Sequence, residues 1–359
     1  MEEKKKRLAN IDLLETLAIV FVVAYHLALN PADGFLTRSV GVKISYFTNT
    51  ILSTCVPIFF FANGYLLLNR PFDLKKHIRK MVTIFALILV WSLITQPIGL
   101  LVSGEPLTVK SVLYAVLDQR TTHFWYLSAL LAIYALFPAF KSLFDSNQKA
   151  FLFVTCVCFV LTFGYNLANN GVAVVSAILH RPLPTLDYPL ITRMNPFRTY
   201  GYAFVYFCVG GLAARHEDRI LSIPAMKRNL SAAAALLIGC ASLWGVGILY
   251  TNFVDNESWD VVWNGYDTVF TMLNVLALYV LTLNDTKDIA LIRQISVNTL
   301  GVFFLHPLVL WLVKPFLKQF EFLKNAPCNL LLAVLVTLCC TGVCMLLRRI
   351  PVVRKLVST

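Results

Sequence analysis

Long runs of apolar, uncharged residues alternate with short polar segments along this chain. Each of the clearest runs reaches or exceeds the roughly 20 residues that cross a bilayer as a helix. These runs are 81–104, 121–140, 150–180, 229–254 and 325–347. The pattern predicts an all-α polytopic integral membrane protein, because a transmembrane barrel would show short alternating strands instead.

We predict about ten transmembrane helices in one membrane-embedded domain that spans residues 1–359. We place them at 10–30, 46–69, 81–102, 121–140, 150–168, 199–214, 230–251, 264–284, 296–316 and 327–347. Only a short tail follows the last span, so we expect no appended soluble catalytic domain. The first span is too long for a signal peptide, and no small-residue cleavage site follows it.

Residues 165–199 do not fit the simple alternation of spans and loops. The apolar segment 172–179 is followed by Pro182, Pro184 and Pro189, and proline cannot continue a helix without losing a backbone hydrogen bond. We expect an external loop here, with a short re-entrant or interfacial piece.

Composition supports the membrane assignment. Hydrophobic residues make up 58% of the chain and charged residues 14%, against roughly 45 to 50% and about 25% in soluble domains. The net charge of +12 does not indicate a nucleic-acid partner, because the basic residues fall in short loops between spans. Most of them lie on one side, which places both termini in the cytoplasm.

Nine cysteines lie mostly inside apolar runs, where a thiol behaves as a small hydrophobe. Their spacing suggests neither a disulfide framework nor a metal site, and we predict no metal.

Ionisable residues inside the predicted spans are candidates for function, because charge in hydrocarbon is costly. Six qualify: Asp12, Glu15, His26, His123, Asp267 and His306. We interpret Asp267 as an orientation or packing residue.

The first predicted helix carries a polar stripe. Glu15 and His26 are 11 residues apart, so they share one helical face at a separation of about 16 Å. Asp12 lies close to the same face. The stripe suits a path for substrates that enter from opposite sides of the membrane, although His26 as a hydrogen-bonded packing residue is the alternative.

For two further histidines the sequence likewise does not decide between a functional role and a packing role. Pro307 follows His306 and bends its helix, so this pair suits either chemistry or a packing joint. His123 precedes Phe124, Trp125 and Tyr126, which is typical of an interfacial aromatic anchor. Aromatic rings beside a histidine also suit a sugar or a cofactor ring.

Several segments together resemble the acyltransferase family 3 membrane proteins, which include O-acetyltransferases of bacterial surface polysaccharides such as the enterobacterial common antigen. The segments are 11–15 (IDLLE), 22–26 (VVAYH), 56–66 (VPIFFFANGYL), 75–79 (KKHIR), 123–127 (HFWYL), 295–301 (ISVNTLG) and 306–307 (HP). Each is weak alone, but their order and intervals cover nearly the whole chain.

The resemblance implies acyl transfer, usually of acetyl from cytoplasmic acetyl-CoA to a hydroxyl of an exported or lipid-linked sugar. It also implies that His26 is the catalytic residue. Two positions depart from the family pattern: Glu15 stands where the family usually has arginine, and Asn63 replaces the serine of a Ser-Gly-Tyr triplet.

The residues themselves suit this chemistry. A neutral imidazole can take a proton from an attacking hydroxyl, or can itself accept the acyl group. Burial in a helical bundle disfavours a charged imidazole, so we expect a neutral His26. For the phosphates of acyl-CoA the nearest cations are Lys75, Lys76 and Arg79.

On the acceptor side we place His123 and Trp125, with Asp12, Glu15 and His306 in supporting positions. We therefore predict a multi-pass O-acetyltransferase of the bacterial plasma membrane. It would have no permanently bound cofactor, acetyl-CoA or another acyl-CoA as co-substrate, and a cell-envelope saccharide or polyprenyl-linked sugar as acceptor. Surrounding membrane lipid is expected, and the oligomeric state is left open.

Two other classes compete with this prediction. A transporter or flippase of an envelope glycolipid would use the polar stripe as a substrate path or proton relay, although such carriers commonly show inverted repeats and the sequence shows none. A catalytically inactive relative that scaffolds an envelope assembly draws its support from Glu15.

Overall fold

The computed structural model describes residues 8–27, 46–118, 123–181, 183, 193–197, 200–254, 265–283 and 287–357. These residues are almost entirely helical and include no strand, which confirms the all-α prediction. Within this part of the chain, eight helices are long and apolar enough to cross a membrane. The total number of spans and the side on which the termini lie stay predictions.

The elements follow one another along the chain without a repeated unit. They are α1 (Ala9–Leu27), η1 (Thr50–Thr54), α3 (Cys55–Leu68), α4 (Leu74–Val102), α5 (Val109–Asp118), α6 (Trp125–Ser146), α7 (Gln148–Phe159), η2 (Val160–Gly164), α8 (Tyr165–Leu179), α10 (Gly201–Arg215), α11 (Glu217–Leu221), α12 (Ala225–Val254), η4 (Gly265–Asp267), α14 (Val269–Thr282), α15 (Ala290–Leu317), η5 (Glu321–Leu323), α16 (Ala326–Leu347) and α17 (Pro351–Arg354).

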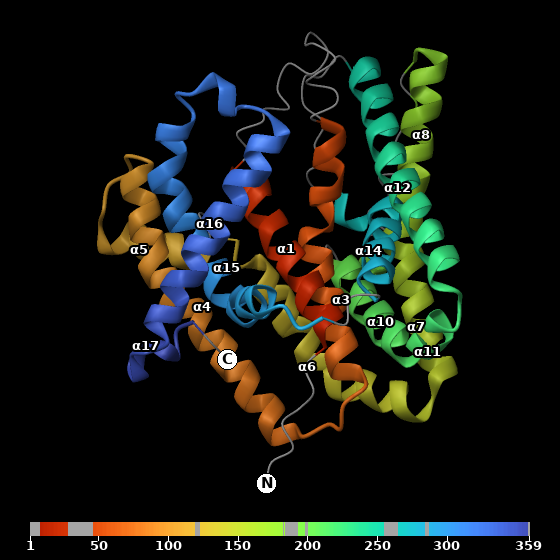
Figure 1. Ribbon diagram of the computed structural model, residues 1–359, viewed down its shortest axis with the longest axis horizontal. Helices are drawn as coiled ribbons and strands as arrows, with labels where there is room; N and C mark the ends of the chain where they lie inside the picture. Colours follow the sequence, from red (N-terminus) through yellow and green to blue (C-terminus); the bar gives the residue numbers. More distant parts are fainter. Residues whose placement is uncertain are drawn as a thin grey trace.

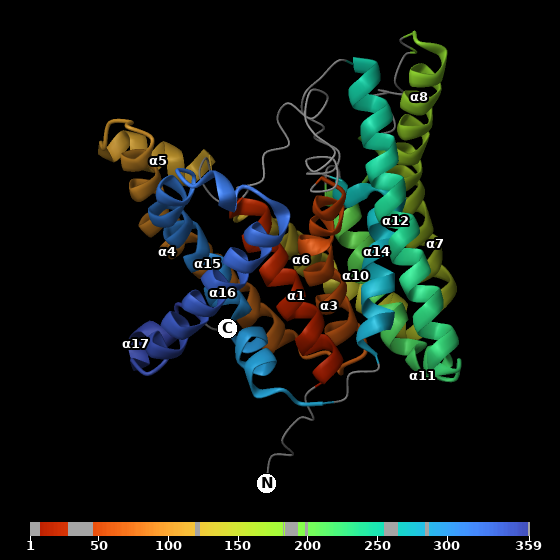
Figure 2. The same cartoon turned by 45° about the horizontal axis from the view of Figure 1, so that its top comes forward.

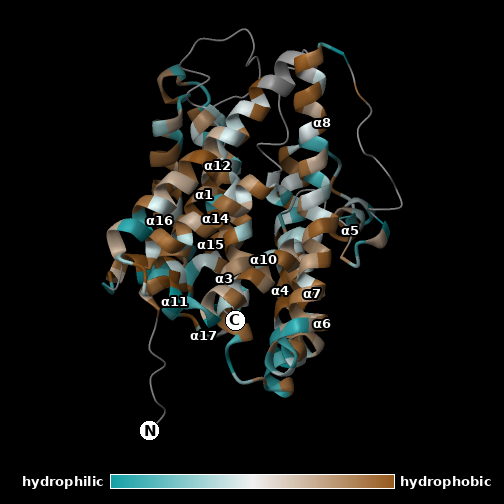
Figure 3. Cartoon of the chain, turned by 90° about the vertical axis from the view of Figure 1, so that its right-hand side faces the viewer, coloured by the Kyte–Doolittle hydropathy of each residue, from teal (hydrophilic) through white to brown (hydrophobic). Residues whose placement is uncertain are grey.

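Helix α1 lies at the centre of the bundle (Figures 1 and 2). It packs against α3, α14, α15 and α16, and most of its residues are buried. The helices farther out expose many large apolar side chains, whereas hydrophilic residues gather near α11 and the end of α6 (Figure 3). A central helix surrounded by other helices can carry polar residues because they face protein and not lipid.

Helices α3 and α10 approach closely because each presents a glycine to the backbone of the other. A Cβ added at Gly64 would lie 1.8 Å from the Phe207 carbonyl oxygen, and one added at Gly210 would lie 2.0 Å from that of Phe61. Both distances are far below any van der Waals contact. Small residues that let two backbones meet are typical of helix pairs in membranes, and this contact fixes the position of α3.

The expected loop at 165–199 is wrong for residues 165–179, and residues 182, 184–192 and 198–199 lie outside the described part of the chain. The helix that starts at Gln148 runs through α7, the π-turn η2 and α8 to Leu179. The residues between 165 and 179 include no proline, so nothing in them breaks the backbone hydrogen bonds. The helix ends just before Pro182. The π-turn η2 lies within it, as single π-turns commonly do in α-helices.

Three further boundaries differ from the predicted spans. Helix α4 begins at Leu74, because Asp73 caps it by accepting a hydrogen bond from the Lys76 backbone N–H. The basic residues Lys75, Lys76 and Arg79 therefore lie on the first turns of α4 and not in a loop. His123 precedes α6, and Asp267 belongs to η4 and not to the following helix.

Candidate active site

Three histidines from distant parts of the sequence meet in the structure. The rings of His26 in α1 and His123 before α6 stack with centroids 3.8 Å apart. His306 in α15 lies 5.4 Å from each of them. The cluster joins all three histidines that the sequence indicated as candidates. It places the imidazoles of His123 and His306 beside His26.

Local structure fixes the ring of His306. Its Nδ1 lies 3.1 Å from the Val302 carbonyl oxygen, and this contact assigns the proton to Nδ1. The opposite nitrogen, Nε2, is buried and has no hydrogen-bond partner in the described part of the chain. It is therefore available as a proton acceptor within the cluster.

The C-terminal end of α1 is held by side chains from two other helices. Lys314 Nζ donates a hydrogen bond to the His26 carbonyl oxygen at 3.1 Å, and Asn329 Nδ2 donates to that of Ala24 at 3.0 Å. The last carbonyls of a helix lack partners within the helix. These contacts satisfy two of them and hold His26 in place, and neither residue stood out in the sequence.

A cavity of about 470 Å³ opens beside the histidines, and we call it the outer cavity. His26 and His123 line one part of it. Trp125 forms an aromatic wall with Tyr200, whose ring lies 6.1 Å away and almost parallel, and with Tyr266 at 5.8 Å. Asp267 contributes a carboxylate to the same cavity, so the outer cavity combines aromatic faces with proton-exchanging and hydrogen-bonding groups.

A second cavity of about 230 Å³ lies toward the opposite end of α1, and we call it the inner cavity. Its polar lining includes Glu15, Asn63, Lys80, Tyr134 and Thr299. The Tyr134 hydroxyl donates to Asn63 Oδ1 at 2.8 Å, and Asn63 Nδ2 donates to the Phe59 carbonyl oxygen at 2.8 Å. The inner cavity therefore offers carboxylate, amide, hydroxyl and ammonium groups, and none of its described lining residues is a histidine.

The two carboxylates of α1 share a partner. The Ser296 hydroxyl lies 2.7 Å from Asp12 Oδ1 and 2.8 Å from Glu15 Oε2. A hydroxyl carries one hydrogen, so it donates to one carboxylate at a time. Ser296 thus joins the inner end of α1 to α15, and Glu15 and His26 lie in different cavities, as their spacing predicts.

The histidine cluster is also a possible metal site by distance. One nitrogen of each ring lies within 4.8 Å of the others. The three ring planes, however, are inclined by only 24 to 27° to one another. Imidazole lone pairs lie in the ring plane, so nearly parallel rings do not direct them at one point. The described arrangement suits proton exchange better than metal ligation.

Comparison with known proteins identifies the family. The sequence profile of the acyltransferase domain matches residues 8–349. The chain belongs to the acyltransferase domain family. The family resemblance drawn from the short motifs is thereby confirmed over nearly the whole chain. The particular likeness to the enterobacterial common antigen enzyme stays a prediction.

A curated relative of this acyltransferase-domain protein is an amino-acid racemase from Enterococcus faecalis. The two sequences are 24% identical over 348 residues, which cover 92% of this chain and 45% of the relative. The chain therefore spans less than half the length of that relative. No solved structure matches the chain.

The three basic residues predicted to bind the donor lie apart from both cavities of this acyltransferase-domain protein. Lys75, Lys76 and Arg79 are exposed on the first turns of α4. Asp73 pairs with Lys76 at 3.4 Å, and the Lys76 backbone N–H lowers the pKa of Asp73 by donating to its carboxylate. These cations face solvent, so they suit a mobile, charged part of a ligand better than its buried part.

Lys80, one helical turn after Lys76, is the cation that lines the inner cavity. Its Nζ lies 5.2 Å above the ring of Tyr134, within the range of a cation–π contact. Lys80 was not among the residues predicted to bind the donor, although it lines the cavity. The spacing from Lys76 on a helix would have shown that the two lie on the same face.

Proposed function

We propose that this protein is a membrane O-acyltransferase that moves an acetyl group from cytoplasmic acetyl-CoA to a hydroxyl of a cell-envelope saccharide or its lipid-linked precursor. The proposal places it in the bacterial plasma membrane. Membership of the acyltransferase domain family supports the reaction class. The observation that carries the proposal is the position of His26, which faces a cavity in series with a second cavity along the same helices.

Four helices line both cavities in turn. Helices α1, α3, α6 and α15 each contribute residues to the inner cavity near one end and to the outer cavity farther along. A donor that enters the inner cavity and an acceptor that enters the outer cavity would approach each other near His26. Bringing two substrates together in this way supplies much of the rate enhancement of a bimolecular reaction.

His26 would act as the general base. Its neutral imidazole takes the proton from the acceptor hydroxyl, and the oxygen attacks the thioester carbonyl carbon. The carbon–oxygen bond forms, the carbon–sulfur bond breaks, and the departing thiolate takes the proton that the His26 imidazole received. In the second route, His26 itself attacks the thioester and the CoA thiolate leaves; the acceptor oxygen then displaces the imidazole, and the hydroxyl proton ends on the CoA thiol.

The neighbouring histidines support either route. His123 stacks on His26, and His306 carries an unpartnered nitrogen beside them. Once His26 holds the proton, a neighbouring neutral imidazole is a suitable group to receive it. This role fits the alternation of His26 between its neutral and protonated forms during each transfer.

The inner cavity suits the pantetheine arm of the donor. Pantetheine carries amide groups, and Asn63, Thr299 and Lys80 offer hydrogen-bond partners for them. The phosphates of CoA would stay outside the cavity, where Lys75 and Lys76 provide exposed cations. The two chemically different parts of the donor would therefore meet hydrogen-bonding groups inside the cavity and cations outside it.

The outer cavity suits a sugar. Sugar rings present apolar faces with hydroxyls around the rim, and Trp125 with Tyr266 provides aromatic faces. Asp267 provides an acceptor for sugar hydroxyls. A site with an apolar wall and a few convergent polar groups is typical of small-ligand binding.

The arrangement of two cavities in series also suits a transporter of an envelope glycolipid. The experiment that separates the two functions uses purified protein with radiolabelled acetyl-CoA and a membrane glycolipid fraction. Acyl transfer predicts that label appears on the glycolipid and disappears with His26→Ala. Label on no acceptor and on no protein side chain, together with movement of glycolipid across vesicles, would support the transporter.

Mass spectrometry of envelope glycans then identifies the acceptor. Cells with and without the gene are expected to differ by the mass of one acyl group on one class of glycan. An unchanged glycan profile in cells that contain abundant protein would contradict a saccharide acceptor.

A further inference from the structure

Two aromatic residues belong to both cavities. Tyr126 and Phe303 line the outer cavity on one side and the inner cavity on the other. Both side chains are buried, and their rings meet at 5.6 Å in an edge-to-face contact. They therefore separate the space that holds the histidines from the space that holds Lys80.

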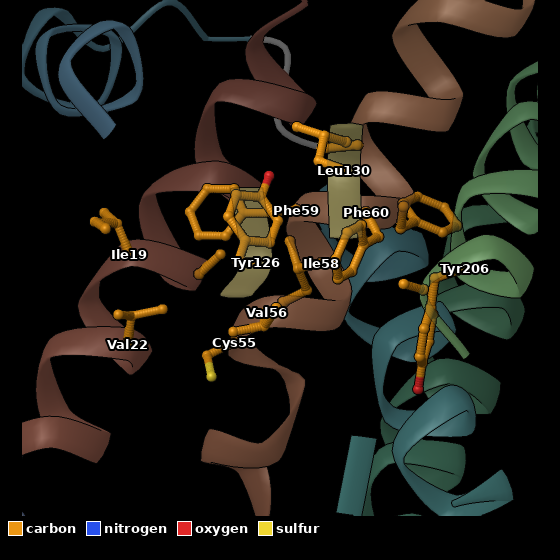
Figure 4. Close-up of a cluster of buried hydrophobic side chains, with 14 of the residues drawn as sticks. Ile19, Val22, Cys55, Val56, Ile58, Phe59, Phe60, Tyr126, Leu130 and Tyr206 are labelled. Carbon is orange, nitrogen blue, oxygen red and sulfur yellow. The ribbon is translucent and has the colours of Figure 1, made fainter. Parts of the chain in front are cut away.

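The ring of Tyr126 is supported from α3. Phe60 lies 4.9 Å and Phe59 5.9 Å from its centroid, and Figure 4 shows these rings beside Tyr126. Its hydroxyl accepts a weak hydrogen bond from Asn63 Nδ2 at 3.4 Å. Asn63 also binds Tyr134, so one amide ties Tyr126 to the wall of the inner cavity.

Phe303 differs from Tyr126 because its phenyl ring has no hydroxyl group that could form a hydrogen bond. It is surrounded by Phe124 at 6.3 Å, Phe304 at 5.8 Å and His306 at 6.1 Å. Rotation of its ring would cost packing contacts but no hydrogen bond. Tyr126 is thus held by packing and a hydrogen bond, whereas Phe303 is held by packing alone.

We propose that Tyr126 and Phe303 form an acyl gate that decides how large an acyl group reaches His26 and that keeps water of the inner cavity away from the thioester. The inference rests on the proposed acyl transfer, because it assigns the gate to the donor's path. A short acyl thioester is compact and largely apolar, so aromatic faces accommodate it while excluding water.

The gate matters chemically because water competes with the acceptor. Attack by water on the thioester carbonyl gives a free carboxylic acid and CoA thiol, and the acyl group is lost. A wider gate would also admit longer acyl chains, because a pocket discriminates between chains by the methylenes for which it has room. Faster hydrolysis of the thioester and acceptance of longer acyl chains would therefore both follow from a change in Tyr126 or Phe303.

The test compares Phe303→Ala with Phe304→Ala. Phe304 is the adjacent residue, is also buried, stacks on Trp91 and lines neither cavity. Purified variants in nanodiscs are given acetyl-, butyryl- and octanoyl-CoA, with and without acceptor. We expect Phe303→Ala to raise the octanoyl-to-acetyl ratio of kcat/KM by about tenfold or more, and to release CoA faster without acceptor.

Two milder variants keep the test valid if Phe303→Ala does not fold. Phe303→Leu retains most of the side-chain volume and is expected to change the ratio and the CoA release in the same direction but less. Tyr126→Phe keeps the ring and removes the hydroxyl that Asn63 contacts, and we expect faster CoA release without acceptor.

A measurement that does not depend on acyl transfer tests the gate independently of the proposed function. Joining the two cavities should let protons cross, so liposomes with Phe303→Ala should lose a pH gradient faster than liposomes with Phe304→Ala. This result would support the gate even if the wild-type protein transferred no acyl group. An active wild type whose Phe303 and Phe304 variants match in chain preference, CoA release and proton leak would overturn it.

Discussion

Four helices line both cavities, but the two cavities differ in chemistry. The outer cavity holds imidazoles, aromatic faces and a carboxylate, whereas the inner cavity holds an amide, an ammonium group, hydroxyls and the carboxylate of Glu15. An imidazole can accept and return a proton, whereas the amide and hydroxyl groups of the inner cavity bind through hydrogen bonds. The difference fits the proposed function, in which proton transfer and donor binding occupy different places along the bundle.

The largest effect is expected when the proposed proton acceptor of the outer cavity, His26, is removed. With His26→Ala we expect acetyl transfer to fall by about 10² to 10⁴-fold, the usual contribution of a general base. Transfer is measured with radiolabelled acetyl-CoA and equal amounts of membrane protein.

A matched histidine change checks that the loss is specific. His180 is exposed at the end of α8 and has a φ of 50°, a conformation that asparagine tolerates. His180→Asn should therefore leave transfer unchanged. Normal acetylation by His26→Ala would remove the proposed mechanism.

A structural change should disturb both cavities together, because α3 lines both. Gly210→Ala places a Cβ against the Phe61 carbonyl oxygen, and we expect overpacking to destabilise the protein by about 1 to 3 kcal/mol. Thermal unfolding in detergent measures the effect. Gly342→Ala in α16 is the control, because nothing lies within 4 Å of an added Cβ there. Equal unfolding temperatures for the two variants would contradict the close α3–α10 contact.

The inner cavity is probed by separating the two parts of the donor. Lys80→Met should raise KM by about fivefold for both acetyl-CoA and acetyl-pantetheine, with kcat nearly unchanged, since it removes ~1 kcal/mol of binding. Replacing Lys75, Lys76 and Arg79 together with methionine should raise KM for acetyl-CoA only, because acetyl-pantetheine lacks the nucleotide phosphates. The reverse pattern would move the donor's phosphates into the cavity.

The smallest expected effect concerns the acceptor. Trp125→Leu removes one aromatic face from the outer cavity, and we expect KM for the saccharide acceptor to rise by about threefold, in line with the energy of one ring contact. KM for acetyl-CoA should not change. Steady-state kinetics with each substrate varied in turn measures both, and a change confined to acetyl-CoA would reassign the outer cavity to the donor.

The sequence predicted the site in part. The interval between Glu15 and His26 placed them on one face of α1, and the structure puts each into a cavity. His306 and His123 were candidates only by residue type and depth. Their contact with His26 joins residues up to 280 positions apart, and no local pattern encodes such a contact.

The inner cavity was largely missed, for a physical reason. Asn63, Tyr126 and Tyr134 lie in apolar runs where periodicity does not separate one face from another. Their meeting in one cavity depends on how α3 lies against α6, and the position of α3 is set on its other contact, with α10, by Gly64 and Gly210. A glycine in a sequence does not say which helix will pack against it.

The sequence by itself determined the class of this protein, because long uncharged apolar runs have one stable arrangement in a bilayer, the helix with all its backbone hydrogen bonds satisfied. It also determined the polar face of α1, which follows from helical spacing alone. Only the tertiary structure decided that three histidines stack, that two cavities lie in series and that Tyr126 and Phe303 stand between them. These features arise from contacts between helices, which depend on the packing of side chains far apart in the chain.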